Sequence, residues 1–290
     1  MKKILITGGN GFFGSRFRIH YENEYQIIST DVDTLNILDK DAVLKRAEEA
    51  KPDYIIHAAA IALTGYCDEN PEKCRDINVT GALNIGEAAR NTGAGLVFLS
   101  SEQVFNGNTE RGPFKEEDIP VPDTVYGQNK LEAEGLLMDM VEKLWILRFT
   151  WMFGLPGKNL PVVNNILWDT VKGIMRGERM KVSPDEYRGL TFVDDMIGNF
   201  SNVFSIPYGR YHIGSRNELS RYEIVKLIFD EMGISSRFDE LIIRDNEKYG
   251  SNPRDVRLDT DKITQAGVIF DTTSDALTRC ITEFSLKFGY

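Results

Sequence analysis

Alternation of apolar strand-like segments with amphipathic helix-like segments constrains the fold of this chain more than any other feature. The first strands are expected at "KILIT", "YQIIST", "PDYIIHAAA", "GLVFLSS" and "LWILRFTWMFG", with a helical segment between successive strands. These segments are apolar almost throughout, as expected for strands of a sheet that helices cover on both faces. The alternation continues to about residue 155 and predicts an α/β fold with a doubly wound parallel sheet.

A glycine-rich segment, "ITGGNGFFGSRF", joins the first expected strand to the first helix. Its glycines Gly8, Gly11 and Gly14 have the spacing G-x-x-G-x-x-G, a variant of the dinucleotide-binding pattern. Glycine lets the backbone turn tightly and approach a pyrophosphate, which lies at the N-terminus of the following helix. The position of this pattern, at the first strand–helix turn, predicts a Rossmann fold that binds NAD(P)H.

Asp31 closes the second expected strand, seventeen residues after Gly14. An acidic residue at this point of the fold bonds the ribose hydroxyls of the adenosine and repels a 2′-phosphate. We therefore expect a preference for NAD over NADP, which a nearby basic residue such as Arg16 would offset.

The sequence pattern becomes less regular after Gly157. Helices are expected near residues 161–176, 193–205, 220–232 and 272–287, and short strands at "KVS" and "RYHIG". We predict an NAD(P)-binding Rossmann domain built from residues 1–157 with 190–214. Residues 158–189 with 215–290 are expected to form a smaller C-terminal substrate-binding lobe.

Two Tyr-x-x-x-Lys sequences occur, at Tyr126 and Lys130 and at Tyr222 and Lys226. Four residues are about one helical turn, so each pair lies on one face of a helix. A nearby ammonium favours the phenolate, and we expect the lysine to lower the pKa of its tyrosine. Only the first pair follows a strand that ends in serine, at Ser101, and ligands of a parallel sheet bind beyond the carboxyl ends of its strands. The sequence therefore selects Ser101, Tyr126 and Lys130 as candidate catalytic residues.

Segments spread from residue 5 to residue 263 carry a resemblance to a known family. They are "TGGNGFFG", "KPDYIIHAAA", "NVTGALNIGEAAR", "LSSEQVFNG", "GPFKEEDIPVPDTVYGQNKLEAE", "LRFTWMFGLPGKN", "TFVDD" and "RLDTDKI". On these segments the chain resembles the extended short-chain dehydrogenases/reductases, and more closely their dTDP-4-dehydrorhamnose reductase-like branch.

This resemblance implies roles for individual residues. Ser101 would bond the substrate carbonyl oxygen, Tyr126 would protonate that oxygen as hydride arrives from the nicotinamide, and Lys130 would bond the nicotinamide ribose. The implied cofactor contacts are Gly8, Gly11, Phe12, Phe13, Gly14, Asp31, Asn36, Ile37, Ala58, Ala59, Tyr126 and Lys130. The implied substrate contacts are Glu102, Gln103, Trp151 and Arg254.

The chain departs from the branch at four places. Asn36 stands where the branch usually has an Asp beside adenine, and "LTGYCDENPE" replaces a Val-Asp-x-Ala-Glu stretch. Glu102 and Gln103 replace Asp-Tyr, and a common Arg-Pro becomes Asn-Pro, followed by Arg254. Three of these departures are on the substrate side. We therefore expect cofactor binding and reduction to be retained, whereas the sequence leaves open whether dTDP-4-dehydrorhamnose is the substrate.

These observations favour an NAD(P)-dependent oxidoreductase that reduces a nucleotide-linked keto-sugar or a related ketone. A sugar-nucleotide 4,6-dehydratase would use an Asp-Glu pair after the serine, and Gln103 has no titratable proton with which to act as its base. A sugar-nucleotide epimerase is an alternative, because the Ser-Tyr-Lys set also serves epimerisation. A non-catalytic cofactor-binding regulatory subunit is another, because the regulatory β subunits of methionine adenosyltransferase resemble the same branch.

Composition narrows the choice of partners. A net charge of -10 and a pI of about 5.0 argue against nucleic acid or an anionic membrane as the main partner. The chain shows neither a signal-peptide pattern nor an apolar run of the ~20 residues that a membrane span needs, so we expect a cytoplasmic protein. Three cysteines without zinc-type spacing and three dispersed histidines predict no metal site. The sequence leaves a homodimer open.

Overall fold

A parallel sheet of six strands forms the centre of the computed structural model, which describes residues 1–287. Its strand order is β2-β1-β3-β4-β5-β10, and every neighbouring pair is parallel. The strands are β1 (Lys3–Thr7), β2 (Gln26–Thr30), β3 (Tyr54–His57), β4 (Gly95–Ser101), β5 (Leu144–Phe149) and β10 (Gly209–Ile213). The order reverses between β1 and β3, with β2 on one side of β1 and the remaining strands on the other, as in doubly wound, Rossmann-like folds, so the predicted fold class is confirmed.

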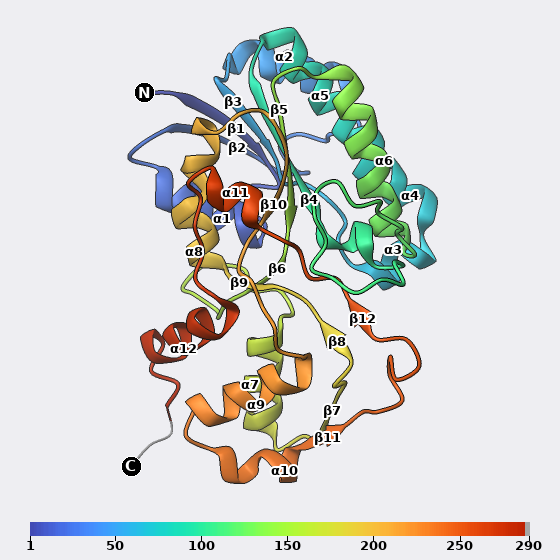
Figure 1. Ribbon diagram of the computed structural model, residues 1–290. Helices are drawn as coiled ribbons and strands as arrows, with labels where there is room; N and C mark the ends of the chain where they lie inside the picture. Colours follow the sequence, from blue (N-terminus) through green and yellow to red (C-terminus); the bar gives the residue numbers. More distant parts are fainter. Residues whose placement is uncertain (288–290) are drawn as a thin grey trace.

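Helices cover both faces of this sheet (Figure 1). One face carries α2 (Lys40–Ala50), α5 (Gly81–Thr92) and α6 (Val125–Met140), and the other carries α1 (Phe12–Tyr21) and α8 (Val193–Phe200). Successive strand residues enter opposite cores, because a strand turns alternate side chains to opposite faces. Ile4 and Ile6 pack in the core of α1 and α8, whereas Leu5 packs in the core of α2, α5 and α6.

Short helices fill the connections at the carboxyl edge of the sheet. α3 (Thr64–Glu69), α4 (Pro71–Arg75) and the π-helical turn η1 (Asp76–Thr80) lie between β3 and α5 and contact α6. The 3₁₀ turn η2 (Glu102–Phe105) follows β4 directly. These connections bring polar residues to the edge where ligands of parallel sheets bind.

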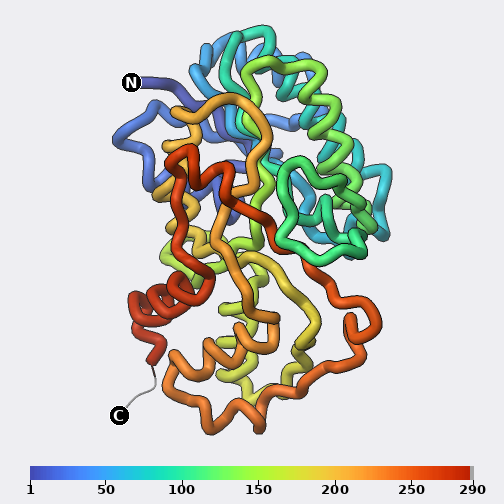
Figure 2. Tube along the Cα trace, viewed as in Figure 1, coloured from blue at the N-terminus to red at the C-terminus, as the bar shows by residue number. Residues whose placement is uncertain are grey.

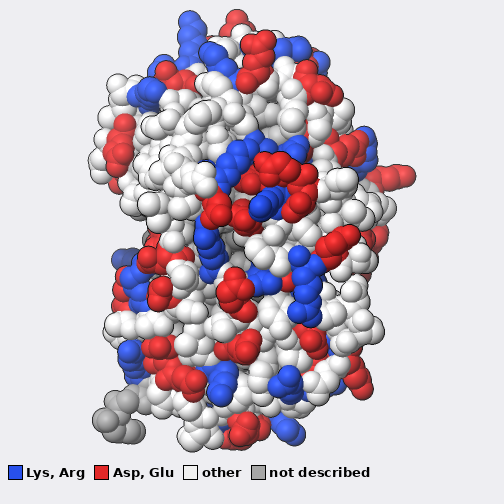
Figure 3. All heavy atoms as spheres, viewed as in Figure 1, with Lys and Arg blue, Asp and Glu red and all other residues white. Residues whose placement is uncertain are grey.

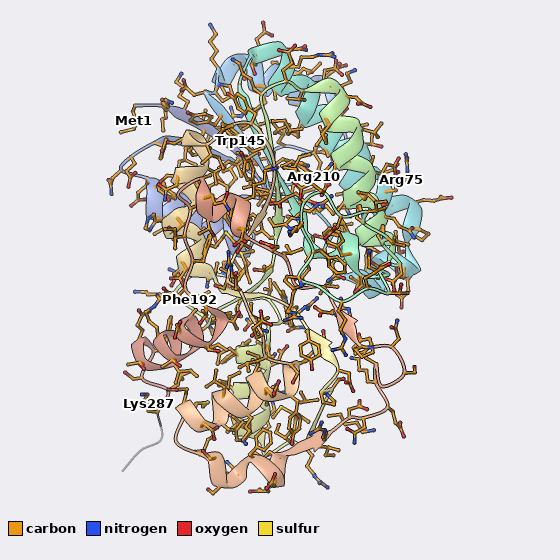
Figure 4. All side chains as sticks on the ribbon, viewed as in Figure 1. Met1, Arg75, Trp145, Phe192, Arg210 and Lys287 are labelled. Atoms are coloured by element: carbon orange, nitrogen blue, oxygen red, sulfur yellow. The ribbon has the colours of Figure 1, made fainter. Side chains whose placement is uncertain are left out.

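The later part of the chain lies mostly below the sheet in Figure 1. It contains two small parallel pairs, β7 with β11 and β8 with β12, and a third pair, β6 with β9, joins it to the sheet region. Phe192, labelled in Figure 4, stacks on Phe153, and Arg279 of α12 lies 5.7 Å from its ring centre. The elements are β6 (Trp151–Phe153), α7 (Ile166–Arg176), β7 (Met180–Val182), β8 (Glu186–Tyr187), β9 (Leu190–Phe192), η3 (Ser201–Ser205), α9 (Arg221–Glu231), η4 (Ser235–Arg237), α10 (Phe238–Leu241), β11 (Ile242–Arg244), β12 (Arg254–Asp255), α11 (Asp261–Gln265) and α12 (Thr273–Glu283).

Two details differ from the sequence-based expectations. The helix expected from residue 161 begins at Ile166, because Asn165 caps it by accepting a hydrogen bond from Trp168 N at 3.0 Å. The second detail concerns the segment after β12, which was expected within the C-terminal lobe. This segment returns to the loop that follows η2, as Figure 2 shows, and Phe114 N donates to Arg257 O at 2.8 Å. α11 then contacts β10 of the sheet. The boundaries proposed for the two parts of the chain remain a prediction.

Charged side chains of both signs are interspersed on the face shown in Figure 3. Within residues 1–287, no helix is both long enough and apolar enough to cross a bilayer. The same residues contain no cluster of three or more His, Cys, Asp or Glu side chains arranged to hold a metal ion.

Burial of His57 makes the stability of the fold depend on pH. Burial, with a further contribution from the charge of Lys130, lowers the pKa of His57 to about 3. In the unfolded chain the histidine has its ordinary pKa of ~6.5. The contribution of the buried, neutral His57 to the free energy of unfolding is therefore fully present above about pH 6.5 and is lost as the pH falls toward the folded-state pKa. We predict that His57→Asn reduces the slope of unfolding free energy against pH, between about pH 6 and 4, by ~1.4 kcal/mol per pH unit.

Urea unfolding at a series of pH values measures this slope. His20→Asn is the matched control, because His20 is exposed and its replacement should leave the slope unchanged. A His57→Asn variant with the parental slope would contradict the assignment of this pH dependence to His57.

Candidate active site

The glycine-rich segment lies between β1 and α1, beside the point where the strand order reverses between β1 and β3. Gly8 has φ +69°, a left-handed conformation that favours glycine, and a Cβ there would lie 2.8 Å from Ala59 N. A Cβ at Gly14 would collide with the Gly8 carbonyl oxygen and lie 2.8 Å from the Cα of Gly9. Gly8 and Gly14 are therefore required by close packing of the backbone, and Ala58 and Ala59 pass directly over the loop.

Gly11 differs from these two glycines. It is the N-cap residue of α1 and has the ordinary φ of -72°. Because glycine has no side chain, no side-chain hydrogen bond caps this helix. Among the described residues, a Cβ at Gly11 would meet only the Gly8 carbonyl oxygen, at 3.2 Å. An open space at a helix N-terminus, lined by glycine backbone, fits the pyrophosphate of a dinucleotide.

Phe12 and Phe13 follow in the first turn of α1, and their side chains point away from this open space. Phe13 packs against Phe149 and Phe200, and the guanidinium of Arg16 lies 4.3 Å from the centre of the Phe12 ring. Of these two residues, the backbone rather than the side chain is available to a cofactor.

Asp31, immediately after β2, is tied to the glycine-rich loop. Its carboxylate accepts hydrogen bonds from Asn10 N at 3.0 Å and Val32 N at 2.9 Å. Arg16 was the basic residue that could have offset the charge of Asp31. It is buried and donates to the carbonyl oxygens of Phe12, Pro161 and Leu155, so it is not free to meet a 2′-phosphate.

The segment expected beside adenine lies next along the chain. Asn36 is exposed, and its side-chain oxygen accepts a hydrogen bond from Leu38 N at 3.1 Å. Ile37 is buried, and its carbonyl oxygen accepts a hydrogen bond from Asn84 of α5 at 2.9 Å. α5 therefore holds this segment in place beside the loop.

Ser101, Tyr126 and Lys130 meet at the carboxyl edge of the sheet. Ser101 ends β4 and accepts a hydrogen bond from Gln103 N at 3.2 Å, which starts η2. Thr124 caps α6 by accepting from Gly127 N, so Tyr126 and Lys130 occupy the first two turns of that helix. The Lys130 ammonium donates to Leu99 O at 2.7 Å and lies 5.9 Å from the centre of the Tyr126 ring.

The protonation of this group differs from the sequence-based expectation. Burial raises the pKa of Tyr126, a hydrogen bond with Ser101 opposes the rise, and the nearby Cys67 and Glu102 add to it. Burial also lowers the pKa of Lys130 to about 8, against the opposing charge of Glu134. The expectation of a lowered pKa for Tyr126 is therefore wrong, because the effect of burial outweighs that of any nearby positive charge. Tyr126 is held as a neutral phenol, the form that can donate a proton.

The second Tyr-x-x-x-Lys sequence lies on α9, away from this edge. The Tyr222 ring packs 5.4 Å from the ring of Phe238, and the Arg244 guanidinium lies 5.1 Å from its centre. No loop of glycines precedes α9, so the choice of Tyr126 over Tyr222 agrees with the fold.

The four predicted substrate residues lie on the same side of the site. Arg254 donates to Gln103 Oε1 at 3.2 Å and to Glu186 Oε1 at 2.8 Å. Glu102 pairs with Arg188, whose Nη2 lies 2.7 Å from Glu102 Oε1. The Arg188 guanidinium in turn lies 4.7 Å from the centre of the Trp151 ring.

The structure adds three residues to this group: Glu186, Arg188 and Arg221. Burial alone would raise the pKa of Glu186, but Arg188, Arg221 and Arg254 together lower it to about 2. Sequence reasoning missed Glu186 and Arg188 because "DEYRG" lies where the strand and helix pattern is irregular. The spacing of Glu186 and Arg188, two residues apart at a short strand, was the signal that could have placed them on one face. A cavity here is lined by Trp151, Ile166, Glu186, Arg188, Leu190, Asn217, Leu219, Arg221 and Ile224.

Residues 1–286 match the RmlD substrate binding domain. The chain belongs to this family. It is 28% identical over 281 residues to the dTDP-4-dehydrorhamnose reductase of Aggregatibacter actinomycetemcomitans, which covers 92% of this chain and 93% of that protein. It is 27% identical over 283 residues to methionine adenosyltransferase 2 subunit beta of Xenopus laevis, covering 92% and 83% of the two chains.

A solved structure shows the same arrangement of the chain. The dTDP-4-dehydrorhamnose reductase of Bacillus anthracis, in complex with NADP, has a TM-score of 0.83 and 25% identity, covering 98% of this chain and 99% of that one. The family and fold predicted from the sequence motifs are thereby confirmed.

The contrast between Gly11 and Gly14 gives a test of the cofactor loop. Gly11→Val directs a side chain into the open space, so cofactor affinity should fall at least about tenfold while the melting temperature stays near the parental value. Gly14→Ala instead places a methyl group against the Gly8 carbonyl oxygen and should lower the melting temperature by several degrees. Fluorescence titration with NADH and NADPH and a thermal melt measure the two effects. Unchanged affinity in Gly11→Val would show that the loop is only a turn.

Asp31 allows a test of cofactor preference. Asp31→Asn retains an acceptor for the loop and removes the charge that repels a 2′-phosphate, so the ratio of NADP to NAD affinity should rise by about tenfold. Asp33→Asn removes the same charge from an exposed position two residues further on and should leave the ratio near the parental value. Equal changes in both affinities for Asp31→Asn would remove Asp31 from the ribose site.

Proposed function

We propose that this protein is an NAD(P)H-dependent reductase of a nucleotide-linked keto-sugar, similar in activity to dTDP-4-dehydrorhamnose reductase. The observation that carries the proposal is the meeting of Ser101, Tyr126 and Lys130 beside the glycine loop at the carboxyl edge of the sheet. The reductase relative and the structure of a relative in complex with NADP support it.

The residues around the loop fit a dinucleotide. In the proposal, the backbone from Gly8 to Phe13 receives the pyrophosphate and Asp31 receives the adenosine ribose, with Asn36 and Ile37 beside the adenine. Ala58 and Ala59 pass the cofactor on the other side, and Lys130 bonds the nicotinamide ribose. When bound, NAD(P)H supplies the hydride that adds to the carbonyl carbon.

Tyr126 supplies the proton in this reaction. Ser101 donates a hydrogen bond to the carbonyl oxygen, and the Tyr126 phenol transfers its proton to the same oxygen, which becomes the product hydroxyl. The phenolate that remains lies near the Lys130 ammonium, whose charge stabilises it. Burial of Tyr126, which keeps the phenol neutral beforehand, places the proton on the correct group for reduction.

The side of the site that carries Arg188, Arg221 and Arg254 binds the nucleotide-linked substrate in this proposal. Arg254 already donates to Asn106, Glu186 and Gln103, so its role is to hold these side chains. Arg221 is partly exposed and donates to Glu186 at 3.0 Å through Nη1. We assign Arg221 to the anionic phosphates and Trp151, beneath the guanidinium of Arg188, to the sugar.

A regulatory role is the second candidate, because methionine adenosyltransferase 2 subunit beta is among the relatives. The complete Ser101, Tyr126 and Lys130 set favours turnover instead. A screen of nucleotide-linked keto-sugars with NADH and NADPH, followed by loss of absorbance, tests the reductase. Native mass spectrometry of the purified protein separates an exchangeable cofactor from the tightly held NAD expected of an epimerase.

Replacement of Tyr126 tests the chemistry directly. Tyr126→Phe removes one oxygen and leaves the packing almost unchanged, so single-turnover reduction should slow by ~10²–10⁴. Cofactor affinity should hardly change in this variant. Lys130→Met should reduce both the rate and cofactor affinity, because it removes the cation near the phenol and a donor to the ribose.

Tyr222→Phe is the matched control, since its helix has the same Tyr-x-x-x-Lys spacing outside the site. Its rate should stay within a few-fold of the parental rate. Reduction at the parental rate by Tyr126→Phe would overturn the catalytic assignment and favour the regulatory role.

A further inference from the structure

Glu134 of α6 places a carboxylate in the interior of the protein, against the sheet. Its side chain is fully buried, and so is that of Arg148, whose Nε and Nη2 donate to the two carboxylate oxygens at 2.9 and 2.7 Å. Ser100 donates to Oε1 at 2.5 Å, and Arg210 Nε lies 3.3 Å from Oε2. Strands β4, β5 and β10 therefore each direct one polar side chain at this carboxylate.

Stability alone is a weak reason for this arrangement. Apolar side chains of similar volume often serve a fold as well as a buried ion pair does, or better. The position of Glu134 in the helix is more informative. It follows Lys130 by four residues, about one helical turn, and Tyr126 precedes Lys130 by another turn. The carboxylate therefore lies on the same buried face of α6 as the two candidate catalytic groups.

Lys130 occupies a position that is unfavourable for an ammonium. Its Nζ donates to Leu99 O at 2.7 Å and lies 4.6 Å from the centre of the Phe98 ring. Burial lowers the pKa of Lys130 to about 8, and the charge of Glu134 opposes this effect. One carbonyl oxygen and one ring face do not replace the hydration of a cation. Retention of the proton at Lys130 therefore depends on a nearby negative charge.

His57, Tyr126 and Cys67 also lie around this end of α6, but all three side chains are neutral at pH 7. Burial, with the charge of Lys130, lowers the pKa of His57 to about 3. Burial raises the pKa of Tyr126, and it raises the pKa of Cys67, which packs beside Tyr126, to about 12. These groups keep their protonation state between pH 6 and pH 9, whereas Lys130 does not.

The fixed charges nearby come from β5, β10 and η2. Arg148 and Arg210 are cations, which disfavour a charge on Lys130, and both contact the carboxylate of Glu134. Glu102 of η2 is an anion, but it is paired with an arginine at 2.7 Å. Glu134 is thus the carboxylate whose charge supports the ammonium.

We propose that Glu134 is a positioning residue that acts through Lys130, keeping it as an ammonium and thereby setting the upper pH limit of cofactor binding. The proposal rests on the assignment of Lys130 to the nicotinamide ribose in the proposed function. An ammonium has three donors, of which Leu99 O takes one, so two remain for the ribose hydroxyls. The neutral amine offers fewer donors and no charge, and it binds the cofactor less tightly.

The affinity for NADH at pH 6 and at pH 9 tests this proposal. Because the pKa of Lys130 is about 8, nearly all of the protein carries this proton at pH 6 and only about a tenth carries it at pH 9. The affinity of the parent should therefore fall about tenfold between the two pH values. Fluorescence titration with NADH, without any ketone, measures this loss.

Glu134→Gln removes the charge and keeps an oxygen that Ser100 and Arg148 can bond. Lys130 should then release its proton at a lower pH, so the loss of affinity between pH 6 and pH 9 should grow to about a hundredfold. A purely structural role for Glu134 would lower the affinity by the same factor at both pH values. That outcome would overturn the proposal.

Arg148→Met is the matched variant, because it breaks the same ion pair from the other side. The carboxylate keeps Ser100 and Arg210 as partners, and a cation rather than an anion has been removed. The loss of affinity between the two pH values should therefore be no larger than in the parent. An increase as large as in Glu134→Gln would show that the intact pair matters, not the charge of Glu134, and would refute the proposal.

Glu132→Gln is a second control on the same helix. Glu132 is partly exposed and pairs with Arg75 at the surface, so its replacement should leave the pH dependence of NADH affinity at the parental value. A change as large as that in Glu134→Gln would assign the effect to the overall charge of α6 and would contradict a specific role for Glu134.

A double variant covers the case in which Glu134→Gln does not fold, as judged by a thermal melt. Glu134→Gln/Arg148→Met removes both charges of the pair, so Arg148 is not left as an uncompensated buried cation. Its loss of affinity between pH 6 and pH 9 should exceed the parental loss several-fold, because the carboxylate that supports Lys130 is absent. A parental loss in this variant would overturn the proposal.

These measurements do not depend on turnover. If the parent binds NADH but reduces no ketone, the reductase function fails, and the comparison of NADH affinities still decides the role of Glu134. If the parent binds NADH equally well at pH 6 and pH 9, or does not bind it, the role of Glu134 is refuted, whichever ketone the protein reduces.

Discussion

A buried ion pair between Glu134 of α6 and Arg148 of β5 fixes the helix that carries the candidate catalytic residues. Neither side chain is exposed, and Arg148 donates to both carboxylate oxygens, from Nε at 2.9 Å and from Nη2 at 2.7 Å. Ser100 of β4 donates to the same carboxylate at 2.5 Å. Removal of Glu134 would leave the buried charge of Arg148 uncompensated, so α6 is held in one position against β4 and β5. This ion pair therefore also fixes Ser101, which follows Ser100 in β4, and Lys130, which lies one helical turn before Glu134 in α6.

The same carboxylate influences the protonation of the site. Lys130 lies one helical turn before Glu134, whose charge opposes the effect of burial on the lysine pKa. Burial acts in opposite directions on the two candidate catalytic groups, because it favours the neutral form of each. Tyr126 is thereby held as an acid, while the opposing charge of Glu134 helps Lys130 to keep its proton. A hydrogen bond to Leu99 O keeps the ammonium at the edge of the sheet.

The sheet, the glycine loop and the Ser-Tyr-Lys set could be predicted from the sequence because each follows from local patterns. Continuous apolar strands, a glycine loop at the first turn and a helical spacing of four need no knowledge of distant contacts. The direction of the Tyr126 pKa shift could not be predicted in this way, because it depends on how deeply the folded chain buries the phenol. Glu186 and Arg188 were missed for a related reason. Their partners Arg254 and Glu102 come from distant parts of the chain, which no local spacing brings together.

Glu186 and Glu102 show how similar ion pairs can serve different ends. Glu186 forms ion pairs with Arg221 and Arg254. Arg254 also donates hydrogen bonds to Asn106 and Gln103, so the pairs around Glu186 stabilise the local structure. Among the described residues, one acceptor of Glu102 and one donor of Arg188 instead have no hydrogen-bond partner. A buried polar network that is only partly satisfied weakens the fold unless another group completes it. That cost is offset if the completing group is a ligand, because its binding then recovers the hydrogen bonds that folding left unmade.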